Sequence, residues 1–184
     1  MSVNRLIGAA CAIVLGLASV SAQADVMVGG SAMLPQKNIV QNAVNSKDHT
    51  TLVAAVKAAG LVETLQGKGP FTVFAPVNAA FDALPAGTVD TLLKPENKAT
   101  LTKVLTYHVV PGRLTSADLD RLIEKGNGSA ELTTASGGKL WVMKNGDRNI
   151  TIKDEAGAVA DISIYDVLQS NGVIHSVDRV LMPK

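Results

Sequence analysis

Hydrophobic and polar residues follow two different periods along the chain. Between residues 38 and 125, apolar residues recur mostly every three to four positions, as they do on the buried face of a helix. From residue 129 onward the period approaches two and glycine-containing turns separate short segments, which indicates strands. Because helices and strands are segregated, the pattern predicts an α+β fold. The main predicted helices cover residues 38–46, 48–60 (with Asp48 as cap and Gly60 as terminator), 95–108 and 116–123, and the later strands cover residues 131–134, 139–144, 148–153, 158–163 and 173–182.

One segment inside the helical half breaks this pattern. Residues 71–75 are largely apolar on both faces of an extended chain, and all three phenylalanines of the protein lie between residues 71 and 81. A short apolar run of this kind is typical of a buried strand. Pro76 ends the strand because it has no N–H to donate, and helical spacing begins at Val77. We therefore expect this strand and the helix after it to form the centre of the core.

The first 24 residues have the pattern of a secretory signal. Arg5 supplies a positive charge, the apolar run 6–20 is short for a membrane span, and residues 22–24 fit a small-x-small cleavage site. We expect residues 1–24 to be removed by cleavage after Ala24. The single cysteine, Cys11, lies within this segment, so the mature chain has no thiol chemistry.

Length and charge narrow the class of protein. Removing 24 of the 184 residues leaves 160, which suits one domain. We expect a flexible lead-in at residues 25–37 and a single domain over residues 38–184. Without Arg5 the chain has 16 basic and 16 acidic residues, so no charge excess favours nucleic acid. No later segment has the length and hydropathy of a membrane span, and we expect a periplasmic or secreted protein.

The residues that could carry chemistry show no recognisable catalytic pattern. His49, His108 and His175 lack the spacing of a metal-binding pair, and no nucleophile elbow or cofactor motif is present. Ser176 follows His175 on a predicted strand, where adjacent side chains point to opposite faces. We therefore expect no enzyme, no metal and no cofactor. His108 ends an apolar helical stripe, and we interpret it as a buried residue that ties the helix end to nearby backbone; His175 is interpreted as structural too.

Three motifs carry a resemblance to a known family. Residues 72–81, 107–112 and 171–183 resemble, in this order, the first signature, the central Tyr-His motif and the second signature of fasciclin-type domains. The resemblance covers residues 38–183 and implies a bacterial secreted protein with a fasciclin-like fold, a β-sandwich or wedge of short strands with a flanking layer of helices. The residues to which it assigns a structural role are Thr72, Val73, Phe74, Ala75, Pro76, Asn78, Phe81, Asn171, Gly172, His175 and Asp178.

The resemblance also suggests interaction residues. In animal matrix members of the family, an Asp-Ile pair before the second signature is proposed to bind integrins, and the Tyr-His motif is implicated as well. Here Asp166 and Val167 occupy the first place, and Tyr107 and His108 match the second. Tyr165 stands where those members have proline, and the signal has a bacterial style. The resemblance therefore supports the position of the interaction residues in this chain better than it supports an integrin as their partner. From the residues alone, Asp166 could instead cap or brace the turn that follows it.

Two functions follow from the resemblance. The first is adhesion at the cell surface or in the matrix, through proteins or polysaccharides and without enzymatic activity. The alternative is an extracytoplasmic carrier of an apolar small ligand such as a carotenoid or a lipid, because some fasciclin-type proteins bind carotenoids. Trp141, Met143 and Met182 are candidates to line such a ligand pocket, with core packing as the competing interpretation.

Overall fold

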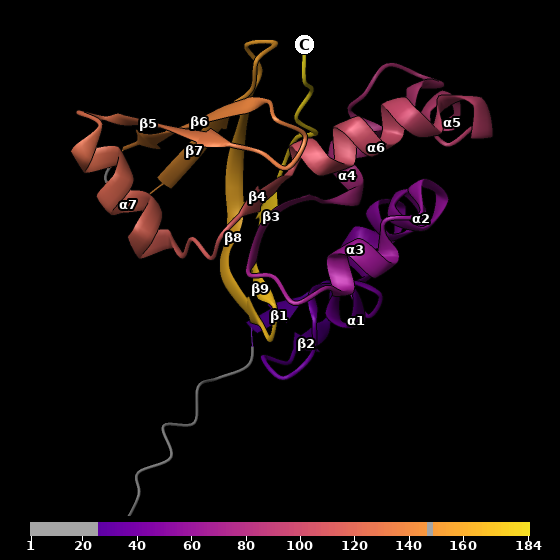
Figure 1. The fold of residues 1–184 in the computed structure, drawn as a ribbon, viewed down its shortest axis with the longest axis horizontal. Helices are drawn as coiled ribbons and strands as arrows, with labels where there is room; N and C mark the ends of the chain where they lie inside the picture. Colours follow the sequence, from indigo (N-terminus) through magenta and orange to yellow (C-terminus); the bar gives the residue numbers. More distant parts are fainter. Residues whose placement is uncertain (1–25, 147–148) are drawn as a thin grey trace, which may run out of the picture.

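The computed structural model describes residues 26–146 and 149–184. The predicted signal, residues 1–24, lies outside the described residues with Cys11, and so does Arg148, the first residue of one predicted strand. The helices before residue 108 gather on one side of the molecule, and the longer strands lie on the other side together with the helix at residues 116–125 (Figure 1). This arrangement confirms the predicted α+β class.

Seven strands form one sheet in the order β4-β3-β9-β8-β7-β6-β5, and β1 and β2 form a separate hairpin. β3 and β9 run parallel, and the other neighbouring pairs run antiparallel. The strands are β1 (Val26–Val28), β2 (Ser31–Met33), β3 (Phe71–Pro76), β4 (Val109–Pro111), β5 (Ser129–Thr133), β6 (Lys139–Asn145), β7 (Asn149–Lys153), β8 (Val159–Gln169) and β9 (Gly172–Val177).

The long strand β8 bends the sheet into a wedge. Its first part pairs with β7 and its second part with β9, and its register shifts between Ile162 and Ile164 and again between Ile164 and Val167. Such irregularities bend a strand and increase its twist. At the opposite side of the wedge, the N–H of Ala135 donates to the carbonyl oxygen of Val109 at 2.7 Å. The two sheets implied by the resemblance are therefore two halves of one sheet that is nearly closed into a barrel (Figure 1).

Helices α1 to α6 lie on one side of the β3–β9 half, whereas α7 packs against β5 and β6 (Figure 1). Each helix is short, so most of its stability comes from the apolar face that it buries. The helices are α1 (Ile39–Ala43), α2 (Thr50–Ala59), α3 (Val62–Gln66), α4 (Asn78–Asp82), α5 (Thr88–Leu92), α6 (Lys98–Tyr107) and α7 (Ser116–Lys125).

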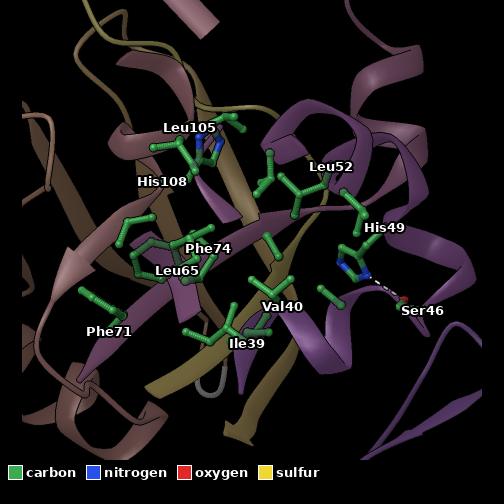
Figure 2. Close-up of a pocket in the computed structure, with 18 of the residues that line it drawn as sticks. Ile39, Val40, Ser46, His49, Leu52, Leu65, Phe71, Phe74, Leu105 and His108 are labelled. Carbon is green, nitrogen blue, oxygen red and sulfur yellow. Dashed lines mark hydrogen bonds between the residues drawn. The ribbon is translucent and has the colours of Figure 1, made fainter. Parts of the chain in front are cut away.

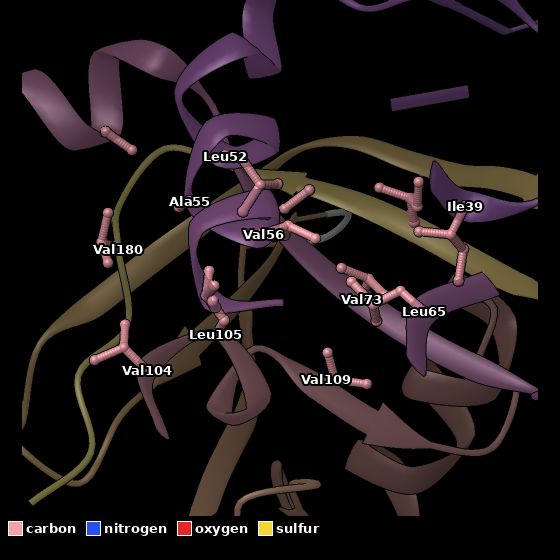
Figure 3. Packing of buried hydrophobic residues seen from close by; sticks show 14 of the residues in the cluster. Ile39, Leu52, Ala55, Val56, Leu65, Val73, Val104, Leu105, Val109 and Val180 are labelled. Atoms are coloured by element: carbon pink, nitrogen blue, oxygen red, sulfur yellow. The ribbon is translucent and has the colours of Figure 1, made fainter. Parts of the chain in front are cut away.

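Two apolar cores meet at β3. Val73 and Ala75 belong to the helix-side core, between the sheet and α1 to α6, and Phe74 belongs to the sheet-side core inside the wedge. Figure 3 shows Val73 near Leu65 and Val56 in the helix-side core. Since successive side chains of a strand point to opposite faces, a strand between two cores must be apolar on both faces. The predicted central strand is confirmed.

The segment expected to be a flexible lead-in is a folded hairpin instead. Residues 26–33 form β1 and β2, and Gly29 and Gly30 make the turn with φ of 58° and 76°, where glycine has no steric penalty. Val28 and Met33 are 4% and 3% exposed and belong to the helix-side core. Each of these strands has only three residues, too few for a period of two to be recognisable in the sequence.

Two predicted element ends also differ. α2 begins at Thr50, and Asp48 lies in the preceding 3-10 turn rather than at the cap. Gly60 ends α2 in the left-handed conformation, as predicted. The last strand ends at Val177 instead of residue 182, because the N–H groups of residues 181 and 182 donate to side chains and not to a neighbouring strand.

Candidate functional site

Two asparagines from the two signatures hold the helices to each other. The side-chain oxygen of Asn78 accepts a hydrogen bond from the N–H of Thr51 at 3.1 Å and another from the hydroxyl of Thr50 at 3.2 Å. Its side-chain nitrogen donates to the carbonyl of Lys47 at 2.8 Å. It therefore caps the start of α2 from a distant part of the chain, in place of the expected Asp48.

Asn171 has the same kind of role at two other helix ends. Its Oδ1 accepts from the N–H of Ile39 at 3.0 Å, and its Nδ2 donates to the carbonyls of Leu65 and Gly67 at 2.8 and 2.9 Å. The start of α1 and the end of α3 are thereby tied to the turn before β9. The next residue, Gly172, must lack a side chain, because a Cβ there would lie 2.0 Å from the carbonyl oxygen of Phe71.

His175 lies at the centre of the sheet and is completely buried. Its Nε2 donates to the carbonyl of Leu114 at 2.9 Å, and its Nδ1 accepts from the N–H of Asp166 at 3.3 Å. The ring stacks on Phe74 with centroids 5.8 Å apart, and Tyr165 meets it edge-on. Burial lowers the pKa of His175, which matches a neutral ring with one donor and one acceptor nitrogen.

Asn78, Asn171 and His175 thus form a frame of hydrogen bonds between distant segments, and the remaining signature residues complete it. The hydroxyl of Thr72 donates to the carbonyl of Gly112 at 2.8 Å and accepts from the N–H of Leu114 at 2.9 Å. Asp178 accepts from the N–H of Asp161 at 2.8 Å and so extends the contact between β8 and β9. The apolar and proline positions of the first signature are buried in β3 and α4: Val73, Phe74, Ala75, Pro76 and Phe81.

Tyr107, a predicted interaction residue, is buried between α6 and the sheet. Its side chain is inaccessible to solvent, and its hydroxyl donates to the carbonyl of Lys139 at 2.6 Å and accepts from the N–H of Glu155 at 2.9 Å. Burial raises the pKa of Tyr107 to about 12. The residue therefore joins the end of α6 to the β5–β6 and β7–β8 turns.

His108 is buried and binds backbone, as expected, and it ties α6 to the C-terminal segment. Its Nδ1 donates to the carbonyl of Val104 at 2.8 Å, and its Nε2 accepts from the N–H of Leu181 at 2.9 Å. Burial lowers the pKa of His108 to about 4, and the bond to Val104 and the nearby Asp154 oppose this shift only in part. The ring is neutral at pH 7, with its proton on Nδ1.

Asp166 and Val167 lie side by side but in different surroundings. Asp166 is half-buried and has a φ of 53°, and its carboxylate accepts from the N–H and the hydroxyl of Ser116. It therefore stabilises the start of α7, where a negative charge is favourable. Val167 is 1% exposed and belongs to the helix-side core. The structure does not bring Asp166, Tyr107 and His108 into one surface.

An apolar cavity of about 100 Å³ lies between the helices and the β3–β9 half of the sheet (Figure 2). Its walls come from the β1–β2 hairpin, α1, α2, α3, the end of α6, and strands β3 and β9. Ile39, Val40, Leu52, Leu65 and Phe71 are among the lining side chains that Figure 2 shows. Periodicity predicted these apolar faces, but it carries no information on how completely they fill the space between them.

A short chain of polar groups borders the cavity. The hydroxyl of Ser46 lies 2.8 Å from Nδ1 of His49 (Figure 2), and the hydroxyl of Ser176 lies 3.4 Å from Nε2. All three residues are buried, and burial lowers the pKa of His49. Each nitrogen of the ring thus has a polar neighbour. No sequence pattern predicted this cluster, since Ser176 lies 127 residues from His49 along the chain.

The three residues predicted to line a ligand pocket do not line this cavity. Trp141 and Met143 lie on the outer face of β6, beside a shallow surface groove that also includes Lys153 and Glu155. Met182 packs at the edge of the helix-side core. Alternation along β6 explains the outward position, because Leu140 and Val142 take the buried face.

The chain belongs to the fasciclin family: residues 47–183 match the model of the Fasciclin domain. It is 48% identical over 145 residues to Protein sll1483 of Synechocystis sp., an alignment that covers 79% of this chain and 73% of that protein. It is also 36% identical over 173 residues to the cell surface glycolipoprotein MPB83 of Mycobacterium bovis, with 91% of this chain and 70% of that protein covered.

The fold also matches a solved structure. A domain pair from the insect cell adhesion molecule fasciclin I superposes with a TM-score of 0.69 and 18% sequence identity, covering 79% of this chain. This chain spans about half of that one, 51%, in keeping with one domain of a pair. The fasciclin fold implied by the three motifs is confirmed.

Within residues 26–146 and 149–184, no three His, Asp or Glu side chains lie close enough together to hold a metal ion. None of the helices described has the length and hydropathy needed to cross a membrane. The polar groups of the motifs bind backbone groups of distant segments, so their arrangement stabilises the domain and positions its surface.

Proposed function

We propose that the protein is a secreted, non-enzymatic fasciclin module that mediates adhesion at the cell surface or in the extracellular matrix by binding proteins or polysaccharides. The observation that carries this proposal is the family match across residues 47–183, together with a cell surface glycolipoprotein among the relatives. The frame formed by Asn78, Asn171 and His175 supports it, because a rigid domain loses little conformational entropy when its surface binds a partner.

Asp166 is the predicted interaction residue best placed to contact a partner. Tyr107, His108 and Val167 are 0%, 2% and 1% exposed, so they would act by holding the surface in place. Asp166 is half-buried, and the bonds to Ser116 fix its carboxylate at the start of α7. A partner would meet Asp166 and the surface around that helix end.

Adhesion of cells from the native source to surfaces coated with the purified protein tests this proposal. The variant Asp166→Asn keeps the shape of the side chain and tolerates a positive φ. The control Asp90→Asn makes the same change at an exposed position of α5. We expect Asp166→Asn to lower adhesion while the control does not, with the thermal unfolding of each variant measured in parallel.

Two outcomes would contradict parts of this proposal. Wild-type protein that adheres no better than an inert coating would refute the adhesion function. Adhesion that is equal for Asp166→Asn and wild type would keep the function but remove Asp166 from the binding surface.

A second candidate function, the carrier of an apolar small ligand, has the apolar cavity in its favour. A binding site of this type is largely apolar with a few polar groups at its edge. The cavity volume of about 100 Å³ is smaller than the ~150 Å³ that admits one benzene, so a complete carotenoid does not fit inside. Mass spectrometry of an organic extract of the native protein tests this function, and an extract without lipid would count against it.

A further inference from the structure

We propose that the apolar cavity binds the alkyl chain of a short monocarboxylic acid, whose carboxylate stays at the rim beside Lys57. This inference rests on the second candidate function, the carrier of an apolar ligand, and names the ligand class. It is independent of the adhesion proposal, which concerns the surface around Asp166.

The inner wall of the cavity favours a hydrocarbon without polar substituents. The polar groups that border it are already engaged: Ser46 and Ser176 with His49, and both nitrogens of His108 with backbone groups. The hydroxyl of Thr106 donates to a backbone carbonyl of its own helix. A hydroxyl or amide carried inside by a ligand would find no partner and would lose its hydrogen bonds to water.

The rim of the cavity favours an anion. Lys57 and Thr64, from the neighbouring helices α2 and α3, are exposed residues of the lining and mark a place where the cavity meets solvent. Among the described lining residues, Lys57 is the one that carries a full charge at neutral pH. An ionised carboxylate is strongly disfavoured in an apolar interior, so it remains in water, where the Lys57 ammonium can pair with it.

The volume sets the length of the chain. An apolar cavity of ~150 Å³ admits benzene with its six carbons, so in proportion a cavity of about 100 Å³ holds about four carbons. Each buried methylene strengthens binding by about fourfold. Affinity should therefore rise with chain length and level off once the cavity is filled, near pentanoate or hexanoate.

The test is a titration of the purified protein with propanoate, butanoate, pentanoate, hexanoate, octanoate and the neutral analogue hexanol, followed by the NMR shifts of the lining methyl groups. We expect about a fourfold gain for each methylene up to the plateau. Lys57→Gln should weaken hexanoate binding two- to fivefold, as expected for an exposed ion pair, and leave hexanol unaffected. The control Lys94→Gln changes an exposed lysine outside the lining.

A second pair of variants tests the cavity itself. Ala43→Leu adds three carbons to the lining and should weaken binding of every probe at least tenfold. Ala54→Leu makes the same change on the exposed face of α2 and should have no effect. The chain-length series needs no mutation, so the inference stays testable if Ala43→Leu disturbs folding.

Each possible failure has its own meaning. Equal binding of hexanoate and hexanol, unaffected by Lys57→Gln, would overturn the carboxylate assignment and leave the apolar carrier in place. Affinity without dependence on chain length, or normal binding by a folded Ala43→Leu protein, would place the ligand outside the cavity. Absence of binding by every probe would overturn both this inference and the carrier function.

Discussion

The buried histidine of the Tyr-His motif gives a quantitative prediction for the pH dependence of stability. The pKa of His108 is about 4 in the folded protein, whereas an unfolded histidine titrates near ~6.5. Above pH 6.5 both states are neutral at this residue, and its contribution to folding is fully present. As the pH falls from about 6.5 toward 4, the unfolded state binds a proton that the folded state does not, so the free energy of unfolding decreases.

The size of this effect follows from the difference between the two pKa values. Linkage gives a maximum slope of about 1.4 kcal/mol per pH unit for one such group. Between pH 7.5 and pH 4.5, His108 alone should therefore remove about 2.5 kcal/mol of stability. The main physical cause is burial, which disfavours the charged ring. Protonation would also remove the acceptor at Nε2, so that the N–H of Leu181 would face a second N–H.

Urea unfolding of the wild type and of His108→Gln at pH 7.5, 5.5 and 4.5 measures this contribution. Glutamine does not titrate, and its carbonyl oxygen can accept a hydrogen bond where Nε2 does. We expect the variant to be less stable at pH 7.5 but to lose about 2.5 kcal/mol less than the wild type on acidification. His49, His175 and the carboxylates titrate in both proteins, so their effects cancel in the comparison. Parallel pH profiles for the two proteins would refute the reasoning.

Three further changes test the frame that the signatures build. Asn171→Ala removes two buried hydrogen bonds and one part-buried one, and it should lower the free energy of unfolding, measured in urea, by about 3 kcal/mol. Asn45→Ala at an exposed site should change it little, and equal effects of the two variants would contradict the role of Asn171. Gly172→Ala places a Cβ 2.0 Å from the Phe71 carbonyl oxygen, so we expect a large fall in the midpoint temperature of thermal unfolding. An unchanged midpoint would show that β3 and β9 can move apart. Tyr107→Phe leaves the part-buried carbonyl of Lys139 and N–H of Glu155 without the hydroxyl, and it should reduce stability by about 1–3 kcal/mol. Unchanged stability would mean that water replaces the hydroxyl.

The motifs identified in the sequence proved informative about position but not about contacts. His108 ends an apolar helical stripe, and the structure buries it and binds it to backbone as expected. Tyr107, which the resemblance suggested as an interaction residue, is buried as well. For Asp166, the sequence left open whether it binds a partner or braces a turn. The structure shows that its carboxylate holds Ser116 at the start of α7, 50 residues earlier. Whether it also contacts a partner stays a prediction.

Local periodicity determined the class of fold and the central strand. The change from helical to strand period predicted α+β, and two apolar faces at residues 71–75 predicted a buried central strand. That this strand lies between two cores came from the structure. Gly60 ended α2 as predicted, because a terminating glycine acts within one turn of its helix. These features depend on residues that are close in sequence, so a sequence pattern contains them.

Only the tertiary structure decided the features that join distant segments. Asn78 caps α2 from 27 residues away, His49 meets Ser176 across 127 residues, and the hairpin at residues 26–33 is stable because the helix-side core covers Val28 and Met33. The apolar cavity belongs to the same class, since it is the space left where several short helices meet a bent sheet. A sequence pattern shows which side chains are buried, but the distance between packed elements, and so the volume between them, depends on all of them together.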